Sequence, residues 1–79
     1  MNEVKTINYT QMAGEYLASA AILKRYIEKI KSDKTLKAQN PREYNSKLAM
    51  VRGMYGECIQ TANVLSERAE KYEKSQYSN

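Results

Sequence analysis

From Asn40 to Tyr72 the chain reads NPREYNSKLAMVRGMYGECIQTANVLSERAEKY. Along this stretch, apolar residues recur at spacings that alternate between four and three positions without a break. These residues are Tyr44, Leu48, Val51, Tyr55, Cys58, Ala62, Leu65, Ala69 and Tyr72. The heptad spacing places them on one face of an α-helix, and no β-strand has this period.

A start signal precedes this stripe. Asn40 is a favourable N-cap, and Pro41 is favoured at the first helical position because its missing N–H would have had no partner. Glu43 stands three residues after Asn40, where a capping box needs an acid. We therefore expect a helix over residues 41–74, followed by a frayed tail over residues 75–79.

The first half of the chain carries a second stripe with the same spacing. It consists of Tyr9, Ala13, Tyr16, Ala20, Leu23, Ile27 and Ile30. With Asn8 as N-cap, it predicts a helix over residues 9–33, and a turn over residues 34–40 follows. Because a short connection favours antiparallel neighbours, residues 1–79 are expected to form a single all-α domain, an antiparallel two-helix hairpin with heptad-like apolar stripes.

Two glycines stand inside the second predicted helix, where each costs about 1 kcal/mol relative to Ala. Gly53 and Gly56 allow three interpretations. They are weak positions that the helix tolerates, or they let another helix approach closely. In the third interpretation the helix breaks there, and the chain forms a three-helix bundle. The second interpretation gives a candidate partner surface, made of Met50, Gly53, Met54, Gly56 and Ile59.

Self-association follows from the small size of a hairpin. Two helices meet along one seam, so the apolar residues that flank it stay exposed to water unless further helices cover them. A homodimeric four-helix bundle is the simplest closure, and another helical protein is the alternative partner. The expected self-association residues are Tyr16, Leu23, Ile27, Ile30, Leu48, Val51, Tyr55 and Leu65.

Positive charge concentrates around the predicted turn. The chain has a formal net charge of +4, but the segment from Lys24 to Arg42 alone carries +5, from seven basic and two acidic residues. The basic residues are Lys24, Arg25, Lys29, Lys31, Lys34, Lys37 and Arg42. They are candidate contacts to nucleic-acid phosphates, and such binding would weaken steeply with salt.

The absence of certain residue types limits the chemistry of a single chain. With no His and one Cys, the sequence offers neither a zinc finger nor a Ser-His or Cys-His pair. We expect no enzyme, no cofactor, no metal and no small-molecule substrate. The start of the chain lacks a signal-peptide pattern and the longest apolar runs have four residues, so we expect a cytoplasmic protein without membrane contact.

The sequence thus predicts a small non-enzymatic interaction or scaffold module that associates with itself through its apolar stripe. The alternative is a small nucleic-acid-binding hairpin that uses the basic segment around its turn.

Overall fold

The computed structural model describes residues 8–77 for the backbone and 8–72 for the side chains, and most of this range is helical. Within that range three helices follow one another: α1 (Tyr9–Lys31), α2 (Lys34–Gln39) and α3 (Pro41–Tyr77). No strand occurs among the described residues. The prediction of an all-α chain is confirmed.

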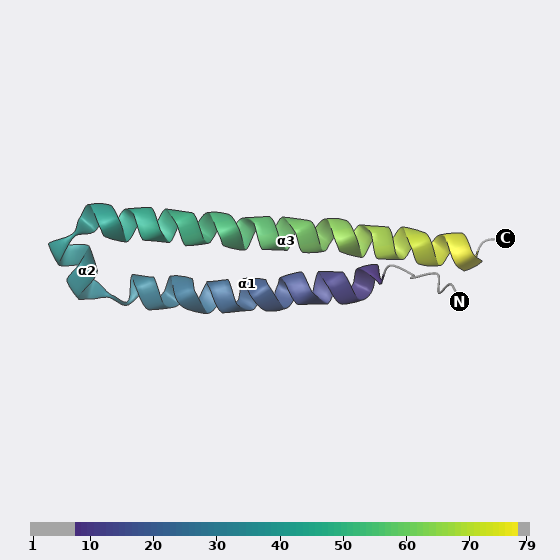
Figure 1. Cartoon of the computed structure of the whole chain (residues 1–79), viewed down its shortest axis with the longest axis horizontal. Helices are drawn as coiled ribbons and strands as arrows, with labels where there is room; N and C mark the ends of the chain where they lie inside the picture. The colour runs from purple at the N-terminus through teal and green to yellow at the C-terminus, as the bar shows by residue number, and fades with distance from the viewer. Residues whose placement is uncertain (1–7, 78–79) are drawn as a thin grey trace, which may run out of the picture.

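The two long helices lie side by side in a single layer. Figure 1 shows α1 and α3 running in opposite directions, with α2 across one end. The molecule measures 62 × 29 × 15 Å. Because one helix with its side chains is about 10–12 Å across, the shortest dimension leaves room for one layer only. Both broad faces of the α1–α3 pair are therefore uncovered by any other described element.

The core is the seam between α1 and α3, where the two predicted stripes meet. Its buried side chains are Ala13, Ala20, Ile27, Ile30, Tyr44, Leu48, Val51, Ala62 and Leu65. The larger ones cluster toward the α2 end, and three alanines fill much of the other half. The seam therefore buries its larger apolar side chains near α2.

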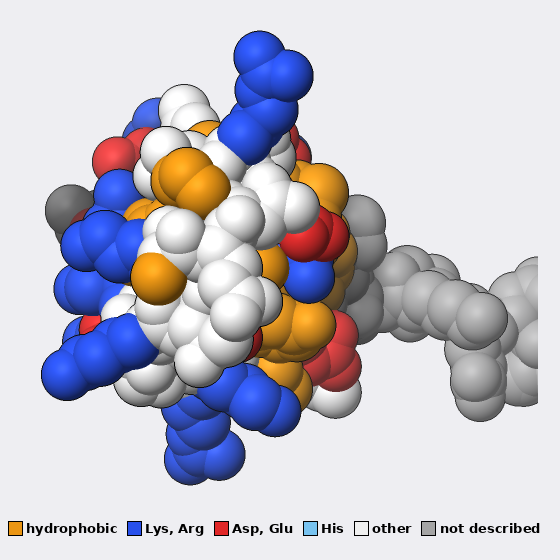
Figure 2. Space-filling view, turned by 90° about the vertical axis from the view of Figure 1, so that its left-hand side faces the viewer, with side chains coloured by type: hydrophobic (Ala, Val, Ile, Leu, Met, Phe, Trp, Pro, Cys, Tyr) orange, Lys and Arg blue, Asp and Glu red, His pale blue; other side chains and the backbone are white. Residues whose placement is uncertain are grey.

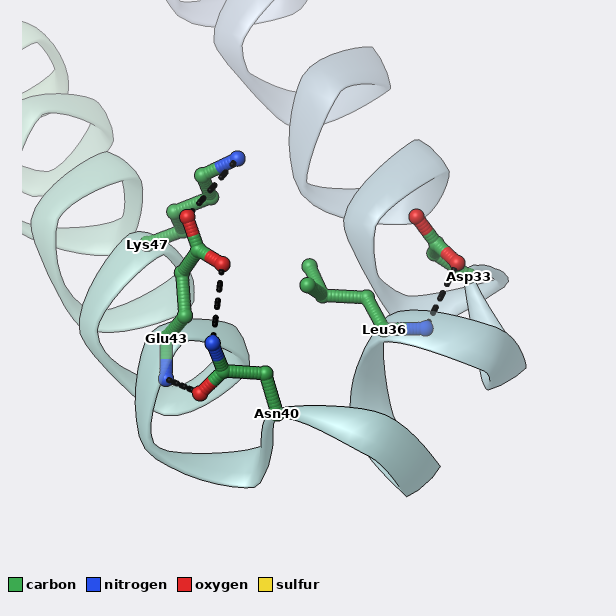
Figure 3. Close-up of polar contacts among 5 residues, drawn as sticks. All are labelled: Asp33, Leu36, Asn40, Glu43 and Lys47. Carbon is green, nitrogen blue, oxygen red and sulfur yellow. Dashed lines mark hydrogen bonds and ion pairs between the residues drawn. The ribbon is translucent and has the colours of Figure 1, made fainter.

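The segment predicted as a turn over residues 34–40 contains the helix α2 instead. Asp33 caps it, since the Leu36 backbone N–H donates to Asp33 Oδ1 at 3.0 Å (Figure 3). As the N-cap of α2, Asp33 has non-helical backbone angles, and the first helix cannot include it. The helix α1 therefore ends at Lys31, two residues before the predicted end. Leu36, half-buried, packs against the core cluster and closes the end of the seam.

Asn40 caps the start of α3 as predicted, with one difference in the capping box. The Glu43 N–H donates to Asn40 Oδ1 at 3.2 Å, and the Asn40 side-chain amide donates to Glu43 Oε2 at 3.3 Å (Figure 3). Glu43 accepts from the side chain of Asn40 rather than from its backbone, because the Asn40 N–H already donates to the Leu36 carbonyl at 2.8 Å.

The helix α3 is continuous through Gly53 and Gly56, so the alternative of a three-helix bundle broken there is wrong. Neither glycine has a positive φ. A cost of about 1 kcal/mol per glycine is small beside the packing of a long helix along the seam. At its other end α3 reaches Tyr77, three residues beyond the predicted end, and residues 78–79 of the predicted tail lie outside the described residues.

Candidate protein interface

An open apolar groove follows the seam on one broad face of the α1–α3 pair. Its volume is about 220 Å³, and both long helices line it. The lining residues are Leu23, Tyr26, Ile30, Lys47, Met50, Val51 and Met54. Lys47 is the one charged side chain among them, and it stands 3.8 Å from Glu43 Oε1, measured from Nζ.

The rim of the groove is unusually exposed for apolar side chains. Met50 is 61% exposed, Tyr26 is 56% exposed and Met54 is 48% exposed. Tyr and Met are suited to contacts, since Tyr combines an apolar ring with a polar tip and Met adapts its shape to a partner. Exposed apolar side chains therefore stand on both sides of one open groove.

The apolar surface extends along α1 toward the open end of the pair. Met12 and Tyr16 line a second hollow together with Glu15 and Ser19. From Met12 the spacing through Tyr16, Ser19 and Leu23 to Tyr26 alternates between four and three, which keeps these residues on one side of the helix. We call the surface made by Met12, Tyr16, Leu23, Tyr26, Met50 and Met54 the groove face.

The opposite broad face has a different character. Leu17 stands nine residues before Tyr26, so at about 100° per residue the two side chains leave α1 in opposite directions. Lys24 and Lys31 follow Leu17 at heptad spacing, and both are exposed. One broad face therefore offers apolar surface along the seam, and the other carries positive charge beside it.

The structure places most of the predicted self-association residues inside the single chain. Ile27, Leu48 and Leu65 are buried where α1 meets α3, so little of their surface is left for a second copy. Leu23, Ile30 and Val51 line the groove. Tyr55 is half-buried, and Tyr16 is exposed on the groove face.

The candidate partner surface around the glycines is not brought together on one face. Met50 and Met54 line the groove, but Ile59 stands nine residues after Met50 and leaves α3 on the opposite side, where it is half-buried. Gly53 and Gly56 lie elsewhere around the helix, and a Cβ at either position would meet nothing within 4 Å. Sequence reasoning identified the two methionines but missed Tyr26, which lies across the groove.

The seven basic residues of the Lys24–Arg42 segment are all exposed. Figure 2, which faces the α2 end, shows Lys and Arg side chains projecting in several directions. Lys31 Nζ lies 4.0 Å from Glu28 Oε2, and Lys37 Nζ lies 5.7 Å from the centre of the Tyr44 ring. The positive charge thus surrounds the α2 end instead of forming one flat patch.

Among the side chains described, those of residues 8–72, no three His, Cys, Asp or Glu lie together as a metal ion would require. Cys58, the single thiol, is half-buried in the seam. None of the helices in the described part of the chain combines the length and the apolarity needed to cross a membrane. Comparisons with protein-family models, with curated proteins and with solved structures give no significant match to this chain.

Proposed function

We propose that this chain is a non-enzymatic interaction module, a helical hairpin that pairs with a second copy of itself through the groove face to form a four-helix bundle. The observation that carries the proposal is the exposed groove between α1 and α3, with Tyr26 on one side and Met50 and Met54 on the other. Apolar side chains of this size favour a partner that removes them from water.

The shortest dimension of the chain supports a partner that packs on it as a second layer of helices. Stable folds pack two layers of secondary structure around a core, and this chain supplies one layer 15 Å thick. A second copy brings the same apolar groove, which makes the two surfaces alike in size and chemistry. Two-fold pairing of like surfaces is the commonest form of assembly among soluble proteins.

The charge distribution supports the groove face as the contacting side. Two copies that met through the opposite face would bring Lys24 and Lys31 of one chain toward those of the other. Like charges in such positions oppose association. The groove face instead carries Lys47 beside Glu43, where the acid offsets much of the positive charge.

The test is a pair of matched charge substitutions. Met54 and Leu17 are both 48% exposed, but they stand on opposite broad faces. We expect Met54→Glu to convert a dimer to a monomer that keeps its helical circular dichroism, and we expect Leu17→Glu to leave the dimer intact. Light scattering on a sizing column measures the mass of each. Equal masses for the two variants would remove the support for the groove face, and a folded monomer in the wild type would favour a different helical protein as partner.

Nucleic-acid binding is the second candidate, favoured by the seven exposed basic residues around α2. A contact to several phosphates loses orders of magnitude in affinity between about 50 and 200 mM salt. Fluorescence anisotropy with mixed-sequence RNA and DNA at both salt concentrations tests this candidate. Absence of binding at 50 mM salt would eliminate it.

A further inference from the structure

We infer that the second copy docks on the groove face in the reversed direction, so that the turns of the two chains, each containing α2, lie at opposite ends of the dimer. The two α1 helices then cross in antiparallel orientation near Ile22. The inference rests on the proposed self-association and adds the orientation of the partner. It is carried by the placement of charge along the groove face, which differs between the two ends of the molecule.

Two symmetric arrangements bring one groove face against another. With the two-fold axis along the helices, both turns lie at the same end, and each α1 packs on the other copy's α3. With the axis across the helices, the turns lie at opposite ends, and α1 packs on α1. Both arrangements cover the groove between Tyr26 and Met50, so the charges and the exposed apolar side chain beside it distinguish them.

Turns at the same end bring like charges together. Lys29 and Lys47 line one hollow beside Tyr26 and so stand at the same level along the pair, one on each helix. In this arrangement Lys29 of one copy faces Lys47 of the other, and the same contact occurs twice. Glu43 beside each Lys47 reduces this repulsion without placing an acid opposite Lys29. The arrangement also places the two Lys24–Arg42 segments, each with a net charge of +5, at one end. Exposed charges closer than a Debye length, about 8 Å at physiological salt, still repel one another.

Turns at opposite ends bring unlike charges together. Glu15, Ile22 and Lys29 are spaced seven residues apart on α1, which aligns them along one strip of the helix. Glu15 stands beside Met12 and Tyr16, and Lys29 stands beside Tyr26, so the strip borders the groove face at both ends. When two such strips meet in antiparallel orientation around Ile22, each Glu15 faces the other copy's Lys29.

The exposure of Ile22 supports a two-fold axis that passes close to this residue. Ile22 is 63% exposed, the largest exposed fraction among the big apolar side chains of the described residues. In the antiparallel arrangement it meets its own copy across the two-fold axis, with an ion pair on each side. This is the pattern by which flanking charges set helix orientation in coiled coils.

Cross-linking between two cysteine variants tests the orientation directly. In a Cys58→Ala background, unlabelled Glu15→Cys is mixed with ¹⁵N-labelled Lys29→Cys and treated with a short bismaleimide. Mass spectrometry then separates the mixed product from the two like products. We expect the 15–29 product to dominate; products of 15 with 15 and of 29 with 29, or a dimer without the 15–29 product, would overturn the orientation.

Charge reversal gives an independent result. With turns at opposite ends, Lys29→Glu faces Glu15 of the other copy, and we expect the dimer dissociation constant to rise about two- to tenfold. Adding Glu15→Lys to the same chain should restore it. With turns at the same end, Lys29→Glu would face Lys47 and strengthen the dimer, which contradicts the inference. A wild-type chain that stays monomeric would instead overturn the proposed self-association itself.

Discussion

Asn40 serves two helices at once. Its backbone N–H donates to the Leu36 carbonyl at the end of α2, and its side-chain oxygen accepts from the Glu43 N–H at the start of α3. Its backbone carbonyl accepts from the Tyr44 N–H as the first bond of the long helix. One residue therefore fixes the corner at which the chain reverses.

We expect Asn40→Ala to lower the free energy of unfolding by about 1 kcal/mol, because the orphan N–H of Glu43 loses its acceptor. Urea denaturation followed by circular dichroism measures the change. Asn45→Ala, an exposed position inside α3, is the control and should leave stability unchanged or slightly raised. A loss at Asn45 as large as the loss at Asn40 would argue against the capping role.

At the scale of the element, the seam and the groove face make different contributions. Leu48 is 8% exposed inside the seam, whereas Met50 is 61% exposed beside it. We expect Leu48→Ala to cost about 2–5 kcal/mol of unfolding free energy, because it removes buried contacts and leaves a cavity. Met50→Ala should change the stability of the folded chain by about 0.5 kcal/mol or less.

Both variants are compared by urea denaturation in the monomeric Met54→Glu background, since association would add the interface contribution of Met50 and make apparent stability depend on concentration. Equal losses for Leu48→Ala and Met50→Ala would mean that the seam is not the core. Because Leu48 is buried inside the single chain, Leu48→Glu should unfold the chain rather than separate two folded copies.

The glycines of α3 give a second prediction about this element. A Cβ at Gly53 or Gly56 meets nothing within 4 Å, so each Gly→Ala change should raise the free energy of unfolding by about 0.5–1 kcal/mol. Gly14→Ala on α1, with equally open surroundings, is the matched control. Thermal unfolding reports the stability and light scattering the mass. If Gly53→Ala or Gly56→Ala lowered the mass, another helix would approach α3 at that position.

The long helices were predictable because their stripes and caps agree. Heptad spacing identified the faces that meet, and Asn8 and Asn40 cap the two helices where the sequence places them. The helix α2 was missed because six residues carry no apolar period. Its one signal was Asp33 before Lys34, a capping residue whose side-chain oxygen accepts the Leu36 N–H.

At the scale of the whole molecule, the groove face depends on how two helices align. An apolar stripe indicates which side of a helix faces its neighbour. Whether Tyr26 lies across the groove from Met50 and Met54 depends on how α1 and α3 are aligned along their length. The connection between α1 and α3 contains α2, which the sequence pattern did not reveal. The methionines were therefore predictable as exposed, and the groove they share with Tyr26 was not.

If a second copy covers the groove face, the wild-type chain is a dimer in solution. Light scattering on a sizing column at micromolar protein concentration and physiological salt measures its mass. We expect a mass of about twice the 9.1 kDa chain, falling to 9.1 kDa in Met54→Glu with no loss of helical signal. A wild-type protein that is fully helical and remains at 9.1 kDa across the concentration range would contradict it.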